Sequence, residues 1–186
     1  EYTLVLRDTL KMELRTINRG SSDFTFSAAF HPYFRVGERD RAEVGGVVRK
    51  TIPMTRALDD GYPAQPGSCS IYRLHDHVLD RTIFLFFENS THVNIWNPGM
   101  QKDCPGTIPN DEWRRFVCVE PALGSSSRPI TLKAGDSVSL MMGIDVRKGS
   151  KTSGYVGKDP RRPAAADEPT GRPFHVLYLG AHPDDF

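Results

Sequence analysis

Apolar and polar residues alternate over short runs throughout residues 1–149, and this alternation decides the class of fold. No window shows the sustained three- and four-residue apolar spacing of an amphipathic helix. Turn-forming residues separate the runs, as in Asn18–Gly20, Asn97–Gly99 and Ala134–Asp136. The pattern predicts an all-β chain with strands at Tyr2–Leu6, Leu10–Ile17, Phe24–His31, Arg81–Phe87, His92–Trp96, Arg115–Glu120 and Ser137–Val146.

The composition changes sharply at Lys148. Residues 149–173 are rich in Gly, Pro, Ser, Ala and charged side chains, which is the composition of a linker. Residues 174–186 begin with an apolar run of strand length that ends in a turn signal. We therefore predict a β domain over residues 1–148, a linker over 149–173, and the start of a second domain or a tail over 174–186.

Charge and hydropathy exclude two classes of partner. The 24 Lys and Arg residues balance 23 Asp and Glu residues, so the net charge of +1 provides no field that would attract nucleic acid or an anionic membrane. No apolar stretch approaches the roughly 18 residues that span a bilayer, and no signal peptide is evident. The chain begins at Glu1, inside a predicted strand and without a methionine, so we expect it to be a fragment. The sequence gives no indication of an oligomeric state.

The three cysteines are Cys69, Cys104 and Cys118, and they lack the close pairing of a zinc ribbon or a redox Cys-x-x-Cys motif. Reduced thiols in a cytoplasmic protein are the simplest account. Cys118 lies two residues before Glu120 on a predicted strand. A nucleophilic cysteine is therefore an alternative there, less favoured than a small core residue.

Two predicted strands end in side chains that can transfer protons. In Phe24–His31 the aromatic side chains share one face, and His31 ends the opposite face of small and polar residues. In Phe116–Glu120 the carboxylate of Glu120 ends an otherwise apolar strand, where burial would make it a better base near neutral pH. The alternatives are a structural histidine and a strand-end glutamate that reaches solvent.

A third strand offers groups that suit a sugar. Its alternate residues His92, Asn94 and Trp96 share one face. An aromatic ring covers the C–H face of a pyranose, while neighbouring polar groups bind the hydroxyls. Core packing of Trp96 is an equally favoured alternative.

Four ordered segments carry a family resemblance, and they are Ala28–Val36, Leu79–Phe84, Val93–Pro98 and Val117–Ala122. They are similar to the signature stretches of the aldose 1-epimerase (galactose mutarotase-like) superfamily, in particular its glucose-6-phosphate 1-epimerase-like branch. The resemblance covers about Tyr2 to Val146. It implies the C-terminal half of a large antiparallel β-sandwich whose concave face holds the active site.

The resemblance also implies roles for individual residues. His31 would be the general acid and Glu120 the general base, while Asp80 would bind sugar hydroxyls. Beside these implied roles, we predict Trp96 and Asn97 as further substrate-binding residues. The implied activity is that of a mutarotase, which interconverts the α and β anomers of an aldohexose or a hexose 6-phosphate by acid/base ring opening. Such a reaction needs no metal or cofactor, and its partner is a small-molecule sugar or sugar phosphate.

The chain departs from the family pattern at two points. Ile83 and Phe84 stand where a tyrosine commonly follows the family's Asp-Arg pair. The family's phosphate-binding arginines precede this chain, so a phosphorylated substrate follows only from the family branch, with Lys102 as a weak local candidate for anion contact. A non-catalytic carbohydrate-binding module is the alternative function.

The last residues carry a second, shorter resemblance. Leu177–Asp185 is similar to the opening strand and loop of zinc-dependent N-deacetylases of the PIG-L/LmbE-like family. That resemblance implies His182 and Asp185 as zinc ligands and Asp184 as base, although Phe186 stands where the family has glutamate. Two protein ligands do not complete a zinc site. A truncated fusion with a deacetylase and a coincidental tail are both open.

Overall fold

The computed structural model describes residues 1–47, 50–64, 69–100, 108 and 111–149. These residues form strands and two short 3₁₀ helices, which confirms the predicted all-β class. In chain order the elements are β1 (Tyr2–Leu6), β2 (Leu10–Ile17), β3 (Phe24–Phe26), β4 (Ala28–Ala29), β5 (Tyr33–Arg35), η1 (Arg39–Arg41), β6 (Ala42–Val47), β7 (Lys50–Pro53), β8 (Leu58–Pro63), β9 (Cys69–Asp76), β10 (Arg81–Glu88), β11 (His92–Asn97), η2 (Glu112–Arg115), β12 (Phe116–Leu123), β13 (Ile130–Leu132) and β14 (Ser137–Lys148).

Several predictions from the sequence lie outside the described residues. They concern the linker beyond Gly149, the deacetylase-like tail with His182, Asp184 and Asp185, and Lys102. Within the described residues, the chain has no helix of the length and apolar character needed to cross a membrane.

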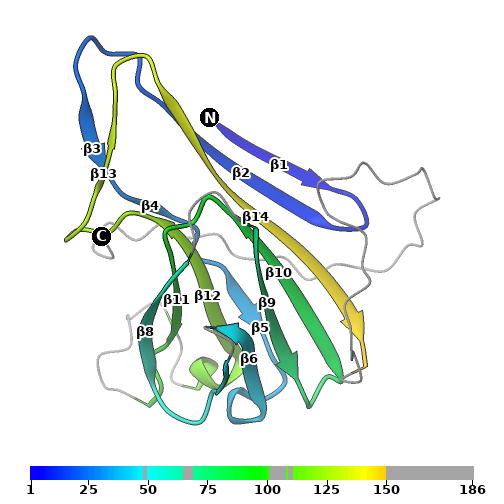
Figure 1. Cartoon of the computed structure of the whole chain (residues 1–186). Coiled ribbons are helices and arrows are strands. Elements are labelled where there is room, and N and C mark those ends of the chain that lie inside the picture. The colour runs from blue at the N-terminus through cyan, green and yellow to red at the C-terminus, as the bar shows by residue number, and fades with distance from the viewer. Residues whose placement is uncertain (48–49, 65–68, 101–107, 109–110, 150–186) are drawn as a thin grey trace.

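Two antiparallel sheets form the layers of a sandwich (Figure 1). The larger sheet has seven strands in the order β1-β2-β14-β10-β9-β6-β7. The smaller sheet has five strands, in the order β4-β12-β11-β8 with β5 also paired to β12. A separate two-stranded sheet joins β13 to β3. Figure 1 shows this small ribbon extending beyond the sandwich, on the side where β2 lies along the long strand β14.

Strand alternation determines which face of the smaller sheet packs into the core. In β11 Val93 and Ile95 are fully buried, and in β12 Val117 and Val119 are fully buried as well. All four belong to one apolar cluster that includes residues of the larger sheet, such as Leu85. Burying a side chain of this size contributes about 1.5–3 kcal/mol. Because successive side chains point to opposite faces, the outer face of the smaller sheet carries the other alternate residues of these strands, which are His92, Asn94 and Trp96 of β11 and Phe116, Cys118, Glu120 and Ala122 of β12.

The predicted strand Phe24–His31 is wrong as a single element. It divides into β3, which pairs with β13, and β4, which pairs with β12. Ser27 lies between these two strands, and His31 lies between β4 and β5. The chain therefore passes from one sheet to another inside a segment that looks continuous in the alternation pattern.

Candidate active site

His31 and Glu120 meet on the outer face of the smaller sheet. Strand β5 pairs with the part of β12 before Glu120, and β4 pairs with the part after it. Both pairings keep the same register. The residues that join β4 to β5 thus bring His31 opposite Glu120. Nδ1 of His31 lies 3.1 Å from Oε1 of Glu120. The two predicted proton-transfer residues are therefore in direct contact. Pairing of their strands would not by itself require this, because the two side chains could also leave a gap between them.

Aromatic rings hold the His31 imidazole in place. The imidazole stacks on the Tyr33 ring with centroids 4.7 Å apart and 3° between the planes, and Trp96 meets it edge-on at 5.5 Å. The Phe116 ring packs against both Tyr33 and Trp96. The side chains of His31 and Glu120 are only 20% and 9% exposed. This shielding from water strengthens the electrostatic interaction between them.

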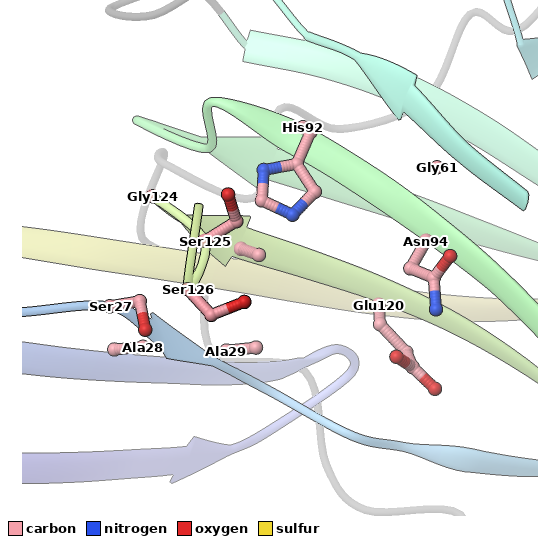
Figure 2. Close-up of a pocket in the computed structure, with 11 residues that line it drawn as sticks. Ser27, Ala28, Ala29, Gly61, His92, Asn94, Glu120, Gly124, Ser125 and Ser126 are labelled. Atoms are coloured by element: carbon pink, nitrogen blue, oxygen red, sulfur yellow. The ribbon is translucent and has the colours of Figure 1, made fainter. Parts of the chain in front are cut away.

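A cavity of about 200 Å³ lies beside Glu120 on this face (Figure 2). Small side chains and glycines form most of its wall and leave space for a ligand, while His92, Asn94 and Glu120 supply polar groups from β11 and β12 (Figure 2). Burial lowers the pKa of His92, so its imidazole is neutral at pH 7 and can both donate and accept a hydrogen bond. The lining residues are Ser27, Ala28, Ala29, Gly61, His92, Asn94, Glu120, Ala122, Gly124, Ser125 and Ser126.

Gly124 shapes one wall of the cavity at a position that disfavours any other residue. Its φ is +65°, in the left-handed region. A Cβ atom at Gly124 would lie 3.0 Å from the backbone nitrogen of Ile130. The Gly124 N–H donates to the Thr91 hydroxyl at 2.9 Å. These constraints fix the start of the turn that carries Ser125 and Ser126 to the cavity.

The sequence profile of the aldose 1-epimerase family matches residues 1–145. The chain belongs to this family. It is similar to a protein of Escherichia coli K12 named "Putative glucose-6-phosphate 1-epimerase", with 30% identity over 125 residues, 59% of this chain and 42% of that protein. A protein of the same name from Salmonella typhimurium is 27% identical over 147 residues, 70% of this chain and 49% of its own length. This aldose 1-epimerase-family chain thus spans about half the length of the curated relatives it matches.

Solved structures share the fold of this family member. A structure from Salmonella typhimurium, described as a "putative mutarotase", superposes with a TM-score of 0.64 at 25% identity, covering 79% of this chain and 52% of that one. The GalM/aldose epimerase homologue from C. elegans superposes with a TM-score of 0.60 at only 11% identity, covering 80% and 59%. The predicted β-sandwich of the galactose mutarotase type is confirmed.

The epimerase-family fold separates the residues that we predicted to bind the sugar. Trp96 lies on the site face against His31, although it does not line the cavity, and its contact with a sugar stays a prediction. Asp80 is exposed in the turn between β9 and β10, at a φ of +46°. That turn belongs to the larger sheet, and Asp80 is not among the cavity residues. The structure therefore does not bring Asp80 to this site.

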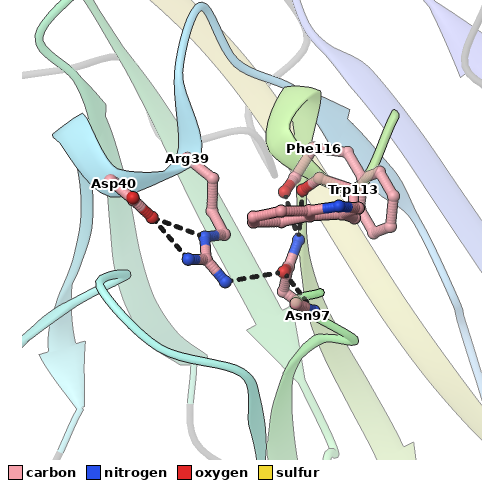
Figure 3. A network of polar contacts seen from close by, with 6 residues as sticks. Arg39, Asp40, Asn97, Trp113 and Phe116 are labelled. Atoms are coloured by element: carbon pink, nitrogen blue, oxygen red, sulfur yellow. Dashed lines mark hydrogen bonds and ion pairs between the residues drawn. The ribbon is translucent and has the colours of Figure 1, made fainter. Parts of the chain in front are cut away.

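Asn97 is not among the cavity residues and instead takes part in a network of polar contacts inside the protein (Figure 3). It is completely buried. Its Nδ2 donates to the carbonyls of Trp113 and Phe116, each at 2.8 Å. Its Oδ1 accepts from the Gly99 N–H at 3.0 Å and from an Arg39 Nη1 at 3.2 Å. Because both donors and the acceptor are used in this way, the predicted sugar contact of Asn97 does not fit its packing.

Cys118 is a core residue in this epimerase-family chain, as the favoured interpretation of the sequence held. Its side chain is fully buried between the aromatic rings of this face. Burial raises the pKa of the Cys118 thiol well above its ordinary value, and the charge of Glu120 and a hydrogen bond to that residue raise it further. The thiol is therefore protonated at neutral pH, which argues against a nucleophilic cysteine.

We expect Cys118 to react with maleimide at least about tenfold more slowly than Cys69, because only the accessible thiolate reacts. Cys69 is partly exposed, whereas Cys118 is buried. The measurement is mass spectrometry of each labelled peptide over time, in a Cys104→Ser variant under native conditions. Denaturant serves as the control and should bring the two rates together. Equal rates in the native protein would contradict the burial of Cys118.

Proposed function

We propose that the protein carrying this chain is a mutarotase that interconverts the α and β anomers of an aldohexose or of its 6-phosphate. The observation that supports this most strongly is the 3.1 Å contact between His31 Nδ1 and Glu120 Oε1, since Glu120 lines the cavity and His31, which is not among the lining residues, contacts Glu120. Opening a pyranose needs a base at the anomeric hydroxyl and an acid at the ring oxygen, two oxygens bonded to the same carbon. An adjacent carboxylate and imidazole offer both groups within the breadth of one sugar ring.

In the proposed reaction Glu120 takes the proton of the anomeric hydroxyl while His31 donates a proton to the ring oxygen. The bond between the anomeric carbon and the ring oxygen breaks, and the open-chain aldehyde forms. Rotation about the neighbouring carbon–carbon bond presents the other face of the carbonyl, and ring closure returns both protons. Each residue acts once as acid and once as base, as a reversible reaction requires.

The size and lining of the cavity support a monosaccharide substrate. A volume of about 200 Å³ is below the roughly 300 Å³ at which pockets for drug-sized ligands begin, so one sugar ring fits better than a longer glycan. His92, Asn94 and the serines of the wall offer hydrogen bonds to hydroxyls. The described lining includes no Lys or Arg, and a phosphorylated sugar is supported only by the names of the curated relatives.

The test is an anomer-interconversion assay on the protein that carries this chain. Pure α-glucose and α-glucose 6-phosphate are dissolved separately, and the approach to equilibrium is followed by polarimetry or NMR against the spontaneous reaction. We expect acceleration, and the faster substrate of the two identifies whether the phosphate is recognised. Saturable sugar binding without acceleration would favour the carbohydrate-binding module, and the absence of both would remove the proposal.

A further inference from the structure

We propose that His31, Cys118 and Glu120 form a site for a thiophilic divalent cation such as Zn²⁺, and that binding of this ion blocks the acid/base pair. An imidazole nitrogen, a sulfur and a carboxylate oxygen from these three residues all lie within 4.8 Å of one another. Each of these three ligand types binds zinc in proteins. None of these three residues belongs to the deacetylase-like motif of the sequence. The proposed metal binding does not depend on the proposed function, whereas the proposed inhibition of the acid/base pair rests on it.

The distances between the ligand atoms suit a tetrahedral ion. With zinc–ligand bonds of roughly 2.0–2.3 Å, neighbouring ligand atoms of a tetrahedral site lie roughly 3.3–3.6 Å apart. His31 Nδ1 and Glu120 Oε1 are already 3.1 Å apart, and 4.8 Å is the upper limit for the others. Cys118 and Glu120 are alternate residues of one strand, so their side chains leave the sheet on the same face. Shifts of about 1 Å in the side chains would complete the three-ligand arrangement.

The burial of the cluster favours a neutral complex. Cys118 is fully buried and Glu120 is nearly so, and an uncompensated charge is costly in such surroundings. Zn²⁺ with one thiolate, one carboxylate and one neutral imidazole carries no net charge. Formation of the complex releases the Cys118 thiol proton to solvent. The rings of Tyr33 and Trp96 pack around the Cys118 side chain and restrict the access of water to its sulfur.

The cavity beside Glu120 provides the route of entry and a place for a fourth ligand. Glu120 lines this cavity, so an ion bound to its carboxylate can complete four-coordination with a water molecule from that side. The bound ion would hold the lone pairs of His31 and Glu120 that the proposed reaction uses. Occupation by the metal and proton transfer to a sugar therefore exclude each other.

The test uses Co²⁺, because a thiolate bound to this ion gives a charge-transfer absorption band in the near ultraviolet. The background is the full 186-residue chain with Cys69→Ser, Cys104→Ser and His182→Ala. Cys118 is then the only cysteine, and the deacetylase-like motif has lost its histidine. We expect one equivalent of Co²⁺ to produce the band and Zn²⁺ to abolish it.

Single substitutions in this background identify the ligands. We expect Cys118→Ala to abolish the band, and His31→Gln to weaken Co²⁺ binding by at least about 100-fold, since a three-ligand site loses one of its donors. Urea unfolding of each variant checks that it is folded. Cys118→Ser keeps the side-chain volume and gives the same comparison if Cys118→Ala unfolds. A folded background chain without the band, or unchanged affinity in folded His31→Gln, would overturn the site.

Inhibition of anomer interconversion by Zn²⁺ provides a separate readout. We expect the Zn²⁺ concentration that halves the rate to match the dissociation constant, and Cys118→Ser to relieve inhibition. If Zn²⁺ binds with the expected ligands yet leaves the rate unchanged, the metal site stands and the blocking role is overturned. In that case His31 and Glu120 would also be removed from the proposed reaction.

Discussion

Glu120→Gln is expected to lower kcat for anomer interconversion by about 10²–10⁴-fold, the range that a general acid or base contributes. The amide keeps the shape of the side chain and can still accept a contact from His31, but it cannot take the proton of the anomeric hydroxyl. Every residue of β12 is buried, so a change of equal volume preserves the packing around the site. We expect sugar binding to persist, and polarimetry at saturating sugar measures the effect.

Glu43→Gln is the matched control for this variant. Glu43 lies in β6 of the larger sheet, where its carboxylate is 3.5 Å from the His77 ring, and it is not among the cavity residues. The same chemical change there should leave turnover unaltered. If Glu120→Gln also retained full turnover, the base would be another residue, and the contact between His31 and Glu120 would be structural.

The alternation in the two strands that carry the site could be predicted, although the sequence left open which face of β11 packs into the core. Val93 and Ile95 in β11 are β-branched residues that suit a buried sheet face, and they alternate strictly with polar or aromatic ones. Val117 and Val119 play the same part in β12. A one-residue shift would turn all of these side chains to the wrong face, so once Val117 and Val119 are known to be buried, Glu120 lies on the outer face.

The neighbourhood of His31 and Glu120 could not be predicted from the strands themselves. It depends on the register of β12 with β4 and β5, which joins segments far apart in the sequence. Local alternation contains no information about this register, and the pairing of the two residues came only from the family resemblance. The turn at Gly124, which closes one side of the cavity, was also not predicted. Its position beside the cavity depends on contacts with residues distant in the sequence.

Strands β6 and β8 were missed because their residues resemble loops. Strand β8 contains Asp59, Asp60 and Gly61, and β6 has an irregular register between Gly45 and Val47. Gly, Asp and Pro are unfavourable in isolated strands, so local rules assign such segments to turns. Pairing with β9 and β11 holds them extended in the folded protein.

Asn97 precedes Pro98 and Gly99, and this sequence predicts an exposed turn. Its amide instead joins the end of β11 to η2 and to Arg39 (Figure 3). The Arg39 guanidinium is itself buried, 4.6 Å from the centroid of the Trp113 ring and paired with Asp40. The sequence pattern predicts the turn, but it does not predict that Asn97 and Arg39 are buried.

Asn97→Ala is therefore expected to lower the free energy of unfolding by about 3–4 kcal/mol, which is large for one substitution. The alanine leaves two backbone carbonyls, the Gly99 N–H and one Arg39 donor without their present partner in the protein interior. Each such group costs about 1–3 kcal/mol, and rearrangement or entry of water recovers part of the sum. The measurement is urea unfolding, where the midpoint should fall while the slope stays constant.

Asn94→Ala is the control, because it makes the same change two residues earlier in β11. Among the described residues, the Asn94 Nδ2 donates to the Asp59 carboxylate alone, at 3.2 Å and in an exposed position, so we expect a loss below about 1 kcal/mol. A small loss in both variants would mean that the contacts of Asn97 rearrange at little cost. The buried network would then not hold η2 against β11, and Asn97 would return as a candidate for binding the sugar.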